Sequence, residues 1–129
     1  MITVLNKGER MFILSIKNIS KFYTLDGKHQ EQALRNINLQ IAKGKITAIY
    51  GPSGCGKTSL LNIISGLDRQ YEGVLEFKGE SLRDLSEIEL TQFRKDKIGF
   101  VFQNFNLIPH QSVLDNVKLP LYVKDLSDR

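Results

Sequence analysis

Cysteine is almost absent from this sequence, and several longer signals are missing as well. Cys55 is the only cysteine, so no disulfide can form within the chain and a reducing compartment is expected. No apolar run approaches the ~18 residues that a membrane-spanning helix needs. The opening segment, residues 1–16, is broken by Lys7, Glu9 and Arg10, and it lacks a signal-peptide core and cleavage site. Without internal repeats, low-complexity segments or linkers, the chain is expected to be a cytosolic protein of one domain.

The charge balance is mildly basic and points to no particular polymer partner. Lys and Arg number 18 against 14 acidic residues, which gives a formal charge of +4. The densest basic cluster, "FRKDK" at 93–97, is not interleaved with aromatic residues that could stack on bases. With 41% hydrophobic and 25% charged residues, the composition is that of an ordinary globular domain. We therefore expect a solvated surface with spare lysines and no nucleic-acid partner.

The first third of the chain has the pattern of β-structure. Apolar residues recur at close to two-residue spacing in "FILSIKNI" (12–19) and in "ALRNINLQIA" (33–42), with "DGK" (26–28) between them as a turn. These segments predict a pair of antiparallel strands. The segment "ITAIY" (46–50) is almost continuously apolar, which predicts a strand buried on both faces.

A helix is predicted directly after Lys57, because leucine and isoleucine recur there at helical spacing as far as residue 67. Gly66 stands where a C-terminal cap is expected. Two further strands are predicted, "GVLEFKG" (73–79) between glycines and "IGFVF" (98–102), a second strand of the fully buried type.

Two more helices follow from capping and stop signals. The segment 86–96 begins with Ser86 and has Glu89 three positions later, the arrangement of a capping box. The segment 113–121 predicts a short helix that ends at Pro120.

The motif "GPSGCGKT" (51–58) carries the strongest chemical signal. It fits G-x-x-x-x-G-K-[ST], the phosphate-binding loop, a pattern that would arise by chance in a chain of this length roughly once in two hundred. A loop that wraps a phosphate must turn successive backbone N–H groups inward, and Gly51, Gly54 and Gly56 supply that freedom. The predicted strand before the loop and the predicted helix after it are the context that the motif requires.

The helix after this loop begins with an ammonium group where an acidic side chain would be favourable. A helix N-terminus carries unpaired N–H groups and a partial positive charge, so Lys57 is unfavourable there unless an anion is bound. A glycine-rich turn without a ligand does not explain that lysine. We expect Lys57 to contact β- and γ-phosphates and the hydroxyl of Thr58 to bind Mg²⁺.

Several classes of protein share the phosphate-loop motif, and the rest of the sequence helps to distinguish them. A GTPase needs D-x-x-G after an apolar strand, but "DKIG" (96–99) follows "QFRK", and no N-K-x-D occurs after the loop. A small-molecule kinase is harder to exclude from the pattern alone, although it does not account for two strands ahead of the loop.

The segments "GPSGCGKTSLLNIISGLD" (51–68) and "IGFVFQNFNLIPHQSVLDNVKLPL" (98–121) resemble the ATP-binding cassette (ABC) transporter ATPases. The resemblance is to the subgroup that powers lipoprotein release, macrolide export and antimicrobial-peptide export or immunity, and it runs from about residue 12 to the last residue. It implies an α/β fold: an incomplete phosphate-loop NTPase core of the ABC type, with an N-terminal antiparallel β subdomain. The implied boundaries are an extension at 1–11, the β subdomain at 12–45 and the core at 46–129.

The resemblance also implies roles for particular residues. Tyr23 matches the aromatic residue that stacks on adenine, with Phe22 as the alternative. Gln103 matches the glutamine that reaches Mg²⁺ and the attacking water, which makes it the catalytic candidate and, with Thr58, a metal ligand. The nucleotide-binding set is Tyr23, Gly51, Ser53, Gly54, Cys55, Gly56, Lys57, Thr58 and Ser59.

Several family motifs are absent from the sequence. It has no L-S-G-G-Q signature, no apolar strand ending in Asp-Glu and no switch histidine after them. We therefore expect a truncated chain that binds ATP and Mg²⁺ but does not hydrolyse ATP alone, and whose strand at 46–50 gains its neighbours from the missing half. The resemblance implies a homodimer in the full-length form and a membrane permease bound through the region around Gln103. It also implies a place in the cytoplasm at the inner face of the cell membrane. An inactive nucleotide-binding or interaction module and a phosphate-loop kinase are the alternatives.

Overall fold

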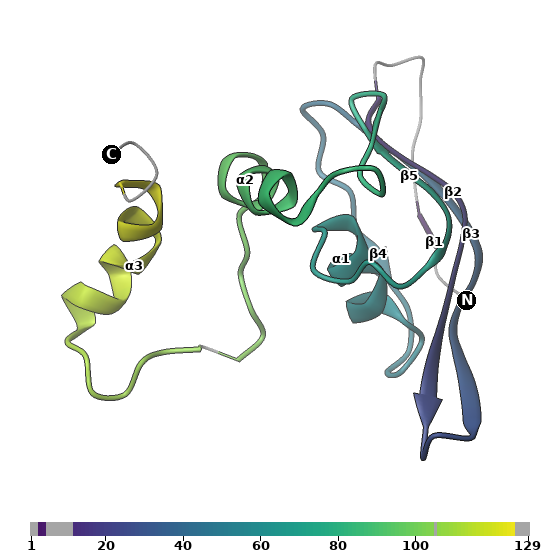
Figure 1. The fold of residues 1–129 in the computed structure, drawn as a ribbon, viewed down its shortest axis with the longest axis horizontal. Helices are drawn as coiled ribbons and strands as arrows, with labels where there is room; N and C mark the ends of the chain where they lie inside the picture. The colour runs from purple at the N-terminus through teal and green to yellow at the C-terminus, as the bar shows by residue number, and fades with distance from the viewer. Residues whose placement is uncertain (1–2, 5–11, 105, 126–129) are drawn as a thin grey trace. The chain divides into compact units, whose positions relative to one another are not determined.

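The structure, a computed structural model, describes residues 3–4, 12–104 and 106–125. Residues 1–90 and residues 91–129 form two compact units, and each is described by itself. The first unit contains the strands and the helix that follows the glycine loop (Figure 1).

A four-stranded antiparallel sheet dominates the first unit. Its strands are β2 (Phe12–Leu25), β3 (His29–Ala42), β5 (Glu72–Phe77) and β6 (Glu80–Ser81), in the order β3-β2-β5-β6. Figure 1 shows β2 and β3 as a long hairpin. The predicted pair of antiparallel strands is confirmed, and both strands extend further toward their common turn than the alternation indicated.

The turn between β2 and β3 explains this extension. Asp26 and Gly27 have φ of 52° and 68°, the left-handed pair that suits the twist of a tight hairpin. Pairing therefore continues outward to Leu25 and His29, although the residues there are exposed and do not alternate between apolar and polar.

The helix α1 (Lys57–Ile64) packs its apolar side into the core of this unit. Leu60 and Ile63 are fully buried, as are Ile16 and Ile19 of β2. Gly66 follows the helix with φ of 71°, so the predicted glycine stop is confirmed. Burial of a side chain of this size contributes about 1.5–3 kcal/mol, which holds α1 in the core of the unit.

The predicted strand at 46–50 is mostly wrong. Only β4 (Ile49–Tyr50) is a strand, and it pairs antiparallel with β1 (Thr3–Val4). Ile46 is fully exposed. A strand buried on both faces needs a sheet around it, and in the described part of the chain β1 is the only strand that pairs with this segment.

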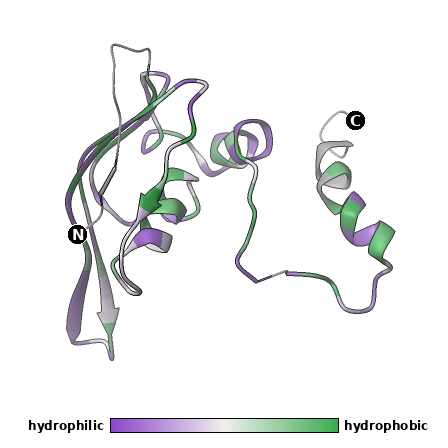
Figure 2. Cartoon of the chain, turned by 180° about the vertical axis from the view of Figure 1, so that it is seen from behind, coloured by the Kyte–Doolittle hydropathy of each residue, from purple (hydrophilic) through white to green (hydrophobic). Residues whose placement is uncertain are grey.

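The predicted strand at 98–102 is also wrong, for the same reason. The segment pairs with no strand among the described residues, and Val101 is 99% exposed. Phe100 and Phe102 stack on each other with ring centroids 5.1 Å apart. In Figure 2, the segment that directly follows α2 (Glu87–Lys97) has the green colour of hydrophobic residues.

The capping box at the start of α2 is confirmed. The Ser86 amide donates to Glu89 Oε2 at 2.8 Å, and the Glu89 amide donates to Ser86 Oγ at 3.3 Å. The Ser86 hydroxyl, which also donates to Glu89, and the Ser86 amide together lower the pKa of the Glu89 carboxyl.

The last helix, α3 (Val113–Asp125), continues through Pro120, so the predicted stop there is wrong. Proline removes one backbone hydrogen bond, and the bonds on either side of it can maintain the helix. Its predicted start at residue 113 is confirmed, but its cap was not predicted: Ser112 Oγ accepts from the Asp115 amide at 3.1 Å.

Candidate functional site

The glycine loop before α1 has the backbone that a phosphate cradle requires. Gly54 and Gly56 have φ of 77° and 91°, which side chains disfavour. A Cβ on Gly56 would lie 2.5 Å from the carbonyl oxygen of Ala33, so only glycine fits between the loop and β3. Around Gly54, by contrast, there is open space.

The N-terminus of α1 is free of protein caps among the described residues. Gly56 is the N-cap and offers no side chain, and the first turn contains no acidic residue. The Leu60 amide donates to the Gly56 carbonyl at 2.9 Å, as the first helical bond. Amides earlier in the turn have no intrahelical acceptor, so they are available to an anion.

The ammonium group of Lys57 lies across the loop. Its Nζ donates to the carbonyl oxygens of Gly51 at 2.9 Å and Pro52 at 2.7 Å, and it is 3.7 Å from the sulfur of Cys55. Both carbonyl groups belong to the loop itself. The cation is therefore held at the loop by contacts that a phosphate oxygen could replace.

Tyr23 lies near the end of β2 and reaches α1. Its hydroxyl donates to Ser59 Oγ at 3.1 Å, and the residue is 38% exposed. Phe22 is similarly exposed, but successive side chains of a strand point to opposite faces, so Phe22 points away from the side that Tyr23 occupies. The fold brings Tyr23 and Ser59 together across a separation of 36 residues.

The two candidate magnesium ligands belong to different units. Thr58 is exposed in the first turn of α1, and Gln103 is exposed in the loop of the second unit. Within the described residues there is no cluster of three or more histidine, cysteine or acidic side chains that could bind a metal without a substrate.

Sequence reasoning missed the ion pair between Lys21 and Asp68, which lies beside Tyr23. Lys21 is on β2 and Asp68 follows α1, and the pair is nearly buried. It also missed Asn116 of α3, whose side chain accepts from the Ile108 amide at 2.8 Å and donates to the Ile108 carbonyl at 3.2 Å. The strand predicted at 12–19 ended before Lys21, so the sequence analysis held no signal for the first of these contacts.

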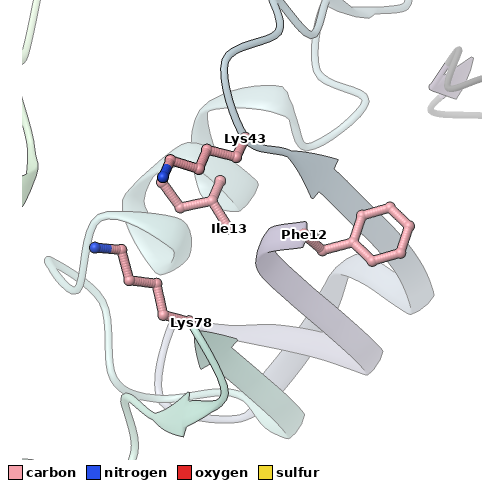
Figure 3. A pocket seen from close by; sticks show the side chains of 4 residues that line it. All are labelled: Phe12, Ile13, Lys43 and Lys78. Carbon is pink, nitrogen blue, oxygen red and sulfur yellow. The ribbon is translucent and has the colours of Figure 1, made fainter. Parts of the chain in front are cut away.

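A separate hollow of about 240 Å³ lies at the end of the sheet where β2 begins (Figure 3). Phe12, Ile13, Lys43 and Lys78 line it, and none of them belongs to the glycine loop or to α1. Its two lysines could attract an anion, but the hollow has no helix N-terminus among its lining residues. The loop at 51–56 has the helix N-terminus that this hollow lacks.

None of the helices described is long and apolar enough to cross a bilayer.

A left-handed glycine loop, an uncapped helix and a lysine across the loop together define a phosphate-loop nucleotide-binding protein. The chain belongs to the ABC transporter family, because its residues 34–129 match the model of that family.

Relatives of the chain show the same family. The ABC transporter ATP-binding protein MJ0796 of Methanocaldococcus jannaschii is 47% identical over 87% of this chain and 47% of its own length. The bacitracin export ATP-binding protein BceA of Halalkalibacterium halodurans is 41% identical over 88% of this chain and 44% of its own length. The chain thus spans a little under half the length of these two relatives.

A solved structure of MJ0796 confirms the predicted fold class. This dimeric post-hydrolysis structure, bound to ADP and Pi, superposes with a TM-score of 0.75 at 45% identity. The match covers 86% of this chain and 47% of the other. The observed antiparallel sheet and phosphate-loop helix are therefore an incomplete ABC ATPase core with its β subdomain.

Proposed function

We propose that this chain is the nucleotide-binding part of an ABC transporter ATPase and that MgATP binds at residues 51–59. One observation carries this proposal: α1 begins without a protein cap, after two left-handed glycines, with the Lys57 ammonium across the loop. Such a site neutralises an anion with backbone dipoles and one full charge. The nucleotide in the MJ0796 structure, ADP with Pi, supports ATP as the ligand.

Each residue of the proposed site has a distinct role. Tyr23 stacks on adenine, since its ring lies beside α1 and is partly exposed. Lys57 moves from the loop carbonyl groups to the β- and γ-phosphates. The remaining members contribute backbone amides or hydroxyls to the phosphates: Gly51, Ser53, Gly54, Cys55, Gly56, Thr58 and Ser59.

The residues present suit a magnesium ion that arrives with the nucleotide. The Thr58 hydroxyl and the Gln103 amide oxygen are the hard oxygen ligands that Mg²⁺ prefers, alongside phosphate and water. The ion would reduce the negative charge of the β- and γ-phosphates. Gln103 would orient the attacking water, which makes it the candidate catalytic residue.

For the whole protein we propose ATP-driven transport. BceA is named for bacitracin export, and the MJ0796 structure is dimeric, which supports a dimeric cassette that works with an export-type permease. We propose that the permease contacts the loop around Gln103, holding the cassette at the cytoplasmic face of the membrane. We propose that the chain has three parts: an extension at 1–11, a β subdomain at 12–45 and a partial core at 46–129.

The test is calorimetric titration of the purified chain with MgATP. Lys57→Ala removes the one ammonium in the loop, and we expect affinity to fall about 10- to 100-fold, since hydrogen bonds to charged groups contribute about 1.5–3 kcal/mol. Because the sequence lacks the Asp-Glu motif, these 129 residues should bind ATP without turning it over.

Lys43→Ala is the matched control, because Lys43 is an exposed lysine of the hollow in Figure 3. Its affinity for MgATP should stay within about twofold of the parent chain. Loss of binding in Lys43→Ala, with Lys57→Ala unaffected, would place the nucleotide in the hollow and refute the proposal.

A further inference from the structure

A nearly buried lysine lies directly behind the tyrosine of the proposed site. The Lys21 side chain is only 3% exposed, and its Nζ lies 4.8 Å from the centroid of the Tyr23 ring. A cation at that distance from an aromatic face is attracted by the electrons of the ring, more strongly where water is excluded. Lys21 therefore restrains one face of the ring.

Asp68 holds the lysine in place. Lys21 Nζ lies 2.9 Å and 2.8 Å from the two carboxylate oxygens of Asp68, which is 18% exposed. The carboxylate also accepts from the Gln70 amide at 2.9 Å, so its own position is fixed. This ion pair joins β2 to the segment that follows α1.

Stability alone does not explain this arrangement. Removing an ammonium and a carboxylate from water is costly, and apolar residues of similar size often replace such pairs without loss of stability. The same strand has an ordinary surface pair: Lys17, 57% exposed, lies 3.1 Å from Glu76. Lys21 differs because it is buried against the Tyr23 ring.

The Tyr23 ring is thus held at two points. Its hydroxyl bonds to Ser59 on α1, and one face lies against the Lys21 ammonium. Tyr23 is nevertheless 38% exposed, which leaves surface for a planar ligand. A ring that is already immobile loses less conformational entropy when a base stacks on it, so fixing it strengthens stacking.

We propose that Lys21, held by Asp68, is a positioning residue for base recognition: it orients the Tyr23 ring so that the purine of a nucleotide stacks at a set distance from the phosphate loop. This inference rests on the proposed nucleotide function and adds a residue to it. Lys21 touches neither the phosphates nor the base, so its substitution affects base recognition and leaves phosphate binding intact.

The test compares two ligands by calorimetry, MgATP and magnesium tripolyphosphate, which has the phosphates without the base. In the paired variant Lys21→Met with Asp68→Leu, MgATP affinity should fall about three- to thirtyfold, the range of a partly desolvated cation–π contact. Tripolyphosphate affinity should stay within about twofold. Lys17→Met, on the same strand, is the matched control and should change neither affinity.

A double-mutant cycle separates positioning from general support of the fold. In a Tyr23→Ala background, the paired variant should cause no further loss of MgATP affinity, because the ring it positions is gone. An equal loss for both ligands, or a further loss without Tyr23, would overturn the inference. If the paired variant does not fold, Asp68→Asn tests the same point, with a smaller loss expected for MgATP only.

The two titrations of the parent chain distinguish failure of the nucleotide function from failure of the positioning role of Lys21. If the parent chain binds neither ligand, the nucleotide function is wrong. If it binds both with equal affinity, the phosphate site stands and the positioning role is refuted.

Discussion

The β2–β3 hairpin and the two apolar segments at 46–50 and 98–102 were all predicted to be strands, yet only the hairpin formed as a sheet. Ile16 and Ile19 of the hairpin are 1% and 0% exposed, whereas Ile46 and Val101 are 100% and 99% exposed. The apolar segments are at least as hydrophobic as the hairpin. What differs is the source of the neighbouring strand.

A hairpin strand finds its partner across a short turn, so the pairing needs only local sequence. A strand buried on both faces needs several partners, and those of a parallel sheet come from distant parts of the chain. Among the described residues, only β1 pairs with the segment 46–50 and no strand pairs with 98–102, so neither segment is enclosed by a sheet.

Core substitution should give the largest contrast between the two regions. Ile19→Ala should lower the free energy of unfolding by about 2–5 kcal/mol, because it leaves a cavity in a packed core. Ile46→Ala removes the same atoms from a fully exposed side chain and should change it by less than about 0.5 kcal/mol. Urea denaturation measures both, and equal destabilisation would show that 46–50 is packed in solution.

The phosphate loop should give an intermediate contrast. Gly56→Ala forces a Cβ against the Ala33 carbonyl, and its left-handed backbone adds about 1–3 kcal/mol of strain. Gly54→Ala has similar backbone strain but open space, so thermal denaturation should show the smaller loss for Gly54→Ala. The reverse order would mean that the loop does not pack against β3 as described.

The capping box of α2 should give the smallest effect, and one that depends on pH. The folded pKa of Glu89 lies below its ordinary value of 4.5, so its stabilisation is present above that pH and is lost as pH falls through the folded pKa. The Ser86 amide resonance should therefore titrate below about pH 4.5. In Glu89→Gln this titration should disappear; its persistence there would assign the shift to another group.

Local signals correctly predicted several features whose partners are near in sequence. The turn at 26–28, the capping box of Ser86 and Glu89 and the stop at Gly66 each depend on groups a few residues apart. The loop motif likewise predicted an uncapped helix start. The candidate nucleotide residues were chosen from sequence, and the fold places Tyr23 against Ser59.

Distant partners could not be predicted in the same way. Lys21 and Asp68 are 47 residues apart, and no spacing rule relates a lysine in a strand to an aspartate after a helix.

One local signal was also misleading. The end predicted for α3 was wrong, because a helix can tolerate a proline when its other backbone hydrogen bonds are kept.

By itself, the sequence determined the hairpin, the glycine loop with its lysine and the helix boundaries at Gly66 and Ser86, because these depend on backbone preferences and short-range hydrogen bonds. The tertiary structure alone decided which apolar segments are buried and where the Lys21 ammonium lies, because burial and ion pairing depend on which surfaces meet. A hydrophobic segment can specify that it needs a partner, but only the folded chain determines whether one is present.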